Sequence, residues 1–154
     1  MPEEPLYHIA QINIGRIRHE TDDTRMADFM DNLNRINELA ERSPGFVWRL
    51  KDDTNNATNI RLYDDPHLLL NMSVWRTIED LEAFTYKTVH TRFVERREEW
   101  FQPFATAYLA LWWVESDRLP TAEEGQEKVA YLESNGPTQL AFTFKERFPM
   151  PGFG

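Results

Sequence analysis

The stretch of this sequence with the clearest chemical potential is YKTVHTRFVERREEWF, residues 86–101. Read as an α-helix of 3.6 residues per turn, it places Tyr86, His90, Phe93 and Arg97 on one side, among apolar neighbours. A titratable imidazole and a guanidinium therefore stand in the stripe that should face the core. An imidazole held away from water can ligate a metal or act as a base. A guanidinium can clamp a carboxylate through two parallel hydrogen bonds.

Each of these residues also has a purely structural explanation, and both explanations stay open. A buried histidine usually has a hydrogen-bond partner, so His90 could simply pair with a backbone carbonyl or a neighbouring side chain. Arg97 could form a buried ion pair with Glu79 or Glu98. If His90 instead faces a pocket, the side chains expected to form its walls are Trp75, Tyr86 and Phe93.

Composition excludes several classes of function. The 154 residues include no cysteine, which rules out disulfides, thiolate zinc sites, iron–sulfur clusters and a cysteine nucleophile. The formal net charge of -9 would repel phosphate backbones, so we expect no nucleic-acid partner. The sequence contains no phosphate-binding glycine loop, HExxH motif or nucleophile elbow, which argues against hydrolases and kinases.

The sequence also predicts where the protein resides. No segment approaches the roughly 18 consecutive apolar residues of a membrane span. The opening MPEEPLYH is acidic and lacks an apolar run, so it does not resemble a signal peptide. We therefore expect a cytoplasmic protein without a membrane span.

Hydrophobic periodicity and turn residues predict a single domain over residues 1–154. The elements follow the order β-α-β-β-α-β, and an additional helix and strand occupy about residues 121–145 before a tail at 149–154. Thr77 and Thr121 are suited to cap the second and third helices, and Glu124 is spaced to complete a capping box with Thr121. The predicted strands are 7–15, 46–50, 67–75, 106–116 and 139–144, and the predicted helices are 22–43, 77–101 and 121–135.

This order is typical of an α+β fold, the ferredoxin-like split βαβ, in which helices cover one face of an antiparallel sheet. Along the third strand, Leu70, Met72 and Val74 form an apolar row, whereas Asn71, Ser73 and Trp75 belong to a mixed one. Neither row is charged enough for a face open to water. We therefore expect a homodimer in which two sheets pack together as a dimeric α/β barrel.

Several segments also carry a family resemblance. NMSVWRTIEDLEAFTYKTVHTRFVERREEWF, LALWWV and GPTQLAFTF resemble an uncharacterised bacterial family, domain-of-unknown-function family 3291, of the dimeric α/β-barrel superfamily. The resemblance covers roughly residues 6–149. It implies the fold and the homodimer, but no established activity.

More distant relatives suggest a chemistry. The pattern SVW…FTY…H is similar to part of the spheroidene monooxygenase family, and the superfamily includes haem-degrading and cofactor-free, quinone-forming monooxygenases. In several haem branches a helix histidine is the axial ligand, a position that His90 fits. The helix tryptophan of the haem-degrading branch falls at Phe84, and its strand asparagine falls at Ile12 or Asn13, depending on register.

The leading hypothesis is a monooxygenase-like protein with a pocket between helix and sheet that binds haem or a flat hydrophobic molecule. His90 would serve as the ligand of a haem iron or as a base, Arg97 would hold an acidic group, and Trp75, Tyr86 and Phe93 would line the pocket. One alternative is a non-enzymatic dimeric module that binds a small molecule or acts as a scaffold. A further alternative is a cofactor-free monooxygenase.

Overall fold

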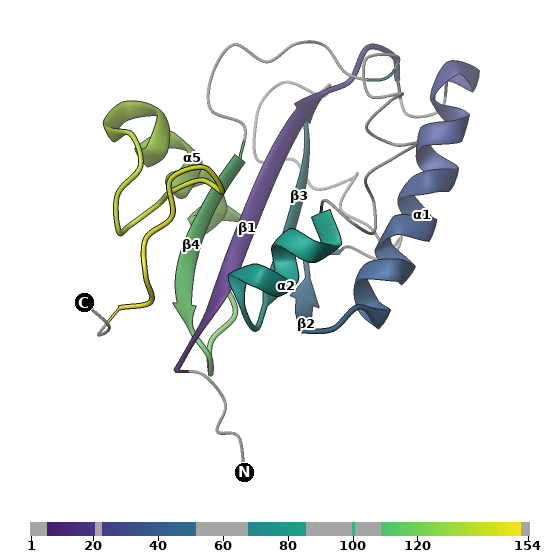
Figure 1. The fold of residues 1–154 in the computed structure, drawn as a ribbon. Helices are drawn as coiled ribbons and strands as arrows, with labels where there is room; N and C mark the ends of the chain where they lie inside the picture. Colours follow the sequence, from purple (N-terminus) through teal and green to yellow (C-terminus); the bar gives the residue numbers. More distant parts are fainter. Residues whose placement is uncertain (1–5, 21–22, 52–67, 86–99, 101–108, 152–154) are drawn as a thin grey trace.

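The computed structural model describes residues 6–20, 23–51, 68–85, 100 and 109–151 (Figure 1). In chain order the elements are β1 (Tyr7–Arg16), the 3₁₀ turn η1 (Thr24–Met26), α1 (Ala27–Arg42), β2 (Phe46–Arg49), β3 (Leu68–Trp75), α2 (Ile78–Ala83), β4 (Leu109–Glu115) and α5 (Ala122–Asn135).

The four strands form one sheet in the order β2-β3-β1-β4, and all neighbours are antiparallel. Strands that follow each other across a helix, β1 and β2 or β3 and β4, are separated in the sheet by one other strand. This is the topology of the ferredoxin-like split βαβ, so the predicted fold class is confirmed. The dimeric barrel, which requires a second chain, remains a prediction.

The helix boundaries follow local capping chemistry. The Asp23 side chain accepts a hydrogen bond from the Arg25 backbone N–H at 2.8 Å and starts η1. Thr77 Oγ1 accepts from the Asp80 N–H at 3.0 Å and starts α2, as predicted. After α1, Gly45 adopts φ = 83°, a left-handed conformation that favours glycine, and the chain turns into β2.

The two faces of the sheet are covered by different helices. Because side chains alternate along a strand, Ile9 and Gln11 of β1 point to one face, and Ala10 and Ile12 point to the other. The first face packs against α1 and α2, since Ile9 shares a buried cluster with Ala40 of α1 and with two α2 residues, Ile78 and Leu81. Figure 1 shows α2 across this face and α5 beyond β4. None of the described helices is long and apolar enough to cross a membrane.

On the second face, α5 packs over β4 and β1 within the single chain. Val129 and Leu132 of α5 join a buried cluster with the sheet residues Ile12, Met72 and Trp112. Their side chains are fully buried or nearly so. The homodimer was predicted because this face needs a cover, and α5 covers its β4 and β1 part. The homodimer remains a prediction, but it now lacks that support.

The segment after α5 differs from the prediction of a strand over 139–144. Its described backbone pairs with the sheet through an isolated bridge in which the backbones of Leu111 and Phe142 exchange hydrogen bonds of 2.8 and 2.9 Å. A second bridge, Thr138 with Ala141, folds the segment back on itself. The N–H of Leu140, which would face β4 in a longer strand, instead donates to Thr138 Oγ1 at 3.1 Å within this turn.

Candidate functional site

The face of the sheet that packs against α1 and α2, named the helix-facing side from here on, contains a network of four neutral polar side chains. They come from the two central strands. Gln11 and Asn13 come from β1, and Asn71 and Ser73 come from β3. The register pairs Gln11 with Ser73 and Asn13 with Asn71, so the four residues form a square on one face. Gln11 and Ser73 are buried, and Asn13 and Asn71 are half-buried.

The four side chains are joined directly by hydrogen bonds. Gln11 Nε2 donates to Asn71 Oδ1 at 2.8 Å and to Ser73 Oγ at 2.7 Å. Asn13 Nδ2 donates to Gln11 Oε1 at 3.1 Å and to Asn71 Oδ1 at 3.4 Å. Because each amide holds its neighbours, the square is a preorganised polar surface and not a set of independent rotamers.

The indole of Trp75 closes one end of this network. Trp75 Nε1 donates to Ser73 Oγ at 2.9 Å, and the side chain is completely buried. Its ring stacks on Phe84 at a centroid distance of 5.0 Å and meets Phe46 edge-on at 5.6 Å. In the described part of the chain Trp75 is therefore packed among aromatic rings, and its polar atom orients Ser73. Its predicted role as a pocket wall remains a prediction.

The positively charged side chain of Arg49 lies next to the polar square, on the edge strand β2. Arg49 of β2 pairs in register with Ser73, which places it on the same face, and it is 5% exposed. Its Nε lies 3.5 Å from a carboxylate oxygen of Glu41 on α1. Asn37, one turn earlier on α1, is also buried. The polar surface is thus bordered by an ion pair that reaches the solvent on the Glu41 side.

Four of the predicted site residues lie outside the described residues: His90, Arg97, Tyr86 and Phe93. Their placement relative to the polar square therefore stays a prediction. Of the five, only Trp75 can be placed.

Sequence reasoning did not identify the square itself. The mixed character of the row containing Asn71 and Ser73 was visible, and Asn13 was noted as one of two positions opposite a strand asparagine of haem-degrading relatives. What was missing was the register of β1 against β3, which brings Gln11 and Asn13 beside them. Polar residues at alternate positions of the two central strands of a predicted sheet are the signal that could have found the site.

A separate open cleft of about 410 Å³ lies between the start of α2 and the C-terminal segment. Trp113, on the helix-facing side of β4, lies in its wall, and its Nε1 donates to the Phe148 carbonyl at 2.9 Å. Arg147 also lines the cleft, but it is held by an ion pair with Glu82 and by a hydrogen bond to the Phe144 carbonyl. The polar groups of these two side chains are thus engaged in fixing the C-terminal segment.

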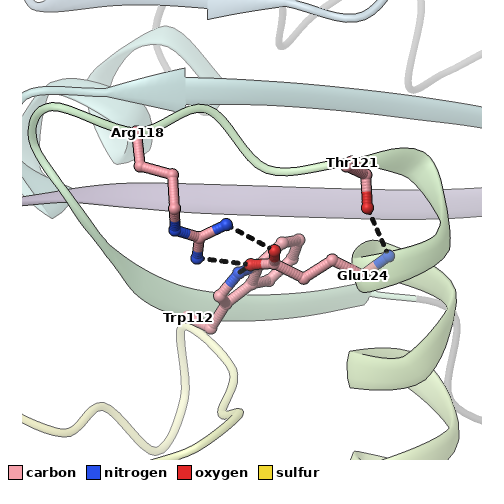
Figure 2. Close-up of polar contacts among 4 residues, drawn as sticks. All are labelled: Trp112, Arg118, Thr121 and Glu124. Atoms are coloured by element: carbon pink, nitrogen blue, oxygen red, sulfur yellow. Dashed lines mark hydrogen bonds and ion pairs between the residues drawn. The ribbon is translucent and has the colours of Figure 1, made fainter.

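The opposite side of the sheet has its own polar cluster, centred on Glu124 (Figure 2). Thr121 Oγ1 accepts from the Glu124 N–H at 3.1 Å, as predicted for the cap. The Glu124 carboxylate does not complete a capping box with a described residue. It accepts from Trp112 Nε1 at 2.8 Å and from the Arg118 guanidinium at 2.7 and 3.1 Å. The hydrogen bonds from Arg118, with that from Trp112, hold the pKa of Glu124 below its ordinary value. This cluster fastens α5 to β4.

The ferredoxin-like sheet with a polar square beneath its helices thus defines a small α+β domain of a known architecture. The family model described as "Domain of unknown function (DUF3291)" matches residues 8–153, and the chain belongs to this family. No curated protein matched the sequence.

Solved structures share parts of this architecture. A candidate antibiotic biosynthesis monooxygenase from Nitrosomonas europaea is 12% identical, with a TM-score of 0.47 over 75% of this chain and 95% of that chain. A protein from Pseudomonas aeruginosa is 14% identical, with a TM-score of 0.49 over 77% and 100% of the two chains. Likeness at this level carries no information about ligand or reaction.

Proposed function

We propose that the protein binds a flat small molecule on the helix-facing side of its sheet and acts on it as a monooxygenase-type enzyme. The observation that carries this proposal is the square of Gln11, Asn13, Asn71 and Ser73. Four neutral polar side chains occupy the centre of a sheet face where apolar residues would pack at lower cost. Pockets for small molecules are mostly apolar with a few placed polar groups, and the aromatic rings around Trp75 border this square.

The square can bind and orient a ligand but cannot transfer protons near neutral pH. Amide and hydroxyl groups do not titrate in that range, so acid–base chemistry must come from elsewhere. We assign that role to His90, with Arg97 as a partner for an acidic group and with Tyr86 and Phe93 as pocket walls. The ring of the ligand would lie over the square. Polar atoms at the edge of the ring would form hydrogen bonds with the amide groups that the square leaves unused.

Haem is one form that the flat molecule could take. The square contributes no imidazole, thiolate, thioether or phenol, so its residues do not fit as ligands of a haem iron. Axial ligation would rest on His90 alone. We therefore derive no step through haem and treat haem binding as a question for experiment.

The test compares the wild type with His90→Ala. Purified protein is titrated with hemin, and the Soret band is followed. In parallel, oxygen consumption is measured with 1,4-naphthohydroquinone in metal-free buffer. The proposal predicts that at least one assay is positive and that His90→Ala loses it, while His19→Ala, a histidine outside the sheet face, retains it. If neither assay responds, or if His90→Ala is unchanged, the enzymatic proposal is wrong.

A second candidate is a binding module without catalysis. The neutrality of the square favours it, because binding requires no titratable group. This candidate predicts ligand binding in both proteins with no turnover in either, and a His90→Ala variant that differs only in stability.

A further inference from the structure

The polar square has a closed end and an open end. At the closed end, Ser73 Oγ accepts from both Gln11 and Trp75. Gln11 Nε2 uses both of its hydrogens, on Asn71 and on Ser73. These side chains are at most 7% exposed, and their hydrogen-bonding capacity is largely spent inside the protein.

At the open end, the two asparagines retain unused capacity. Asn71 Oδ1 accepts from Gln11 and Asn13, but among the described residues no acceptor is found for the Asn71 NH₂ group. Asn13 donates through its NH₂ group, and the same part of the chain supplies no donor to Asn13 Oδ1. Both side chains are half-buried, so part of each is accessible to solvent. A ligand there meets one donor group and one acceptor side by side.

This pairing does not depend on which amide atom is oxygen and which is nitrogen. Exchanging O and N in Gln11, Asn13 and Asn71 together reverses every amide hydrogen bond, and Ser73 then donates to Gln11 while it still accepts from Trp75. In the reversed network Asn71 presents the acceptor and Asn13 presents the donor. The open end offers one of each in both cases.

We propose, building on the function proposed above, that the open end of the square recognises a flat ligand with a carbonyl oxygen beside an N–H or O–H donor. The carbonyl oxygen accepts from one asparagine, and the adjacent donor binds the amide oxygen of the other. A carboxylate fits poorly, because one of its oxygens would face an amide oxygen. A pure hydrocarbon would leave both amides unsatisfied, which is costly once water is displaced.

The test uses 2-quinolone, which has N–H and C=O side by side, and N-methyl-2-quinolone, in which a methyl group replaces the donor hydrogen. Maltol, with a hydroxyl beside a ring carbonyl, tests the O–H form. Dissociation constants are measured by isothermal titration calorimetry on the full chain. We expect 2-quinolone, maltol or both to bind, and 2-quinolone to bind at least about tenfold more tightly than its N-methyl analogue, since a buried acceptor is left unpaired in the latter.

The matched variant is Asn71→Asp, which keeps an oxygen for the hydrogen bonds from Gln11 and Asn13 but replaces the free NH₂ group by a second oxygen. We expect its affinity for 2-quinolone to fall at least about tenfold, because the ligand carbonyl then meets a carboxylate. Asn135→Asp, at the exposed end of α5, is the control for the change of charge and should bind like the wild type.

The outcomes separate this inference from the function on which it rests. Equal affinity for 2-quinolone and its N-methyl analogue would overturn the inference and leave the binding pocket standing. Absence of binding by all three probes would also overturn the inference, and it would overturn the proposed function only if the hemin and oxygen-consumption assays are negative as well. Circular dichroism of Asn71→Asp confirms that a loss of affinity is not a loss of fold. Should that variant fail to fold, Asn13→Asp in the folded protein provides the same test. Its carboxylate can only accept from Gln11 and Asn71, which forces the reversed network, so both side chains then present an oxygen and the ligand carbonyl finds no donor.

Discussion

At the scale of single residues, the structure assigns Ser73 a larger role than its size suggests. One hydroxyl oxygen accepts hydrogen bonds from the amide of Gln11 and from the indole of Trp75, and all three side chains are buried. Trp75 is an N–H donor only, so the position of its ring fixes Ser73 as an acceptor. Ser73 in turn holds the Gln11 amide in place, and that amide contacts both asparagines. The positions of the side chains at the open end therefore depend on a tryptophan that a ligand at that end does not touch.

This chain of contacts predicts the effect of Ser73→Ala. The substitution leaves two buried donors without their acceptor, and we expect it to lower the free energy of unfolding by about 1–3 kcal/mol. Urea denaturation followed by tryptophan fluorescence measures the change. The control is Ser134→Ala on the exposed side of α5, which should change stability by less than about 0.5 kcal/mol. Equal effects of the two substitutions would show that the network contributes nothing to folding.

At the scale of elements, α5 is held on the sheet by an ion pair as well as by apolar packing. Because the folded-state pKa of Glu124 is lowered, its ionised form stabilises the fold. That contribution is fully present above the pKa of an unfolded glutamate, about 4.3, and is lost as the pH falls through the lower pKa of the folded state.

We therefore predict that Glu124→Gln is less stable than the wild type at pH 7 and that the difference shrinks as the pH falls below about 4.3. Urea unfolding at a series of pH values between 7 and 3 measures it. Glu123 is also in the first turn of α5 but is exposed. The stability of Glu123→Gln should therefore differ less from that of the wild type, and the difference should change less with pH. A gap between Glu124→Gln and the wild type that stays constant with pH would contradict the role assigned to the carboxylate.

Helix α5 lies close against the sheet at Gly125. A Cβ at this position would lie 2.8 Å from Ile12 Cδ1 and 3.0 Å from Met72 Sδ. Although alanine is the better helix former by about 1 kcal/mol, overpacking of this kind costs about 1–3 kcal/mol.

We accordingly expect Gly125→Ala to be less stable than the wild type in urea, although alanine has the higher helix propensity. Ala130→Gly, on the exposed side of the same helix, measures how much the difference in helix propensity between alanine and glycine alone changes the stability. If Gly125→Ala proves more stable, α5 does not sit on the sheet as closely as described.

The elements show what could be predicted from the sequence and what could not. Strand alternation and threonine caps are local signals, so the sheet elements and the starts of α2 and α5 were predicted to within a few residues. Glu124 had the correct spacing for a capping box, but its carboxylate turns to Trp112 and Arg118, contacts that only tertiary packing creates. The square likewise depends on strand register, which the order of elements does not specify.

At the scale of the whole molecule, helices of the chain pack on both faces of its sheet. Trp112 and Trp113 point to opposite faces, as adjacent strand residues must, with Trp112 beneath α5 and Trp113 on the helix-facing side. The face that would meet a partner sheet in a dimeric barrel is occupied by α5. A homodimer of this chain would therefore use a different surface or require α5 to move.

We predict that the homodimer, if it forms, leaves α5 in place. Sedimentation equilibrium over a range of concentrations distinguishes the 18.3 kDa chain from a particle of twice that mass. Glu124→Gln, which loosens α5, should not alter the association constant. A single 18.3 kDa species at all concentrations would refute the homodimer, and a dimer strengthened by loosening α5 would indicate that the sheet faces do meet.

We propose that the helix-facing polar square, and not the open cleft beside Trp113, receives the ligand. A ¹⁵N–¹H correlation spectrum of the side-chain amides and indoles, recorded while 2-quinolone is added, distinguishes the two sites. We expect saturable shifts of the Asn71 and Asn13 amide signals, with little change at the Trp113 indole. Shifts confined to the Trp113 indole, with the asparagine signals unmoved, would contradict this proposal.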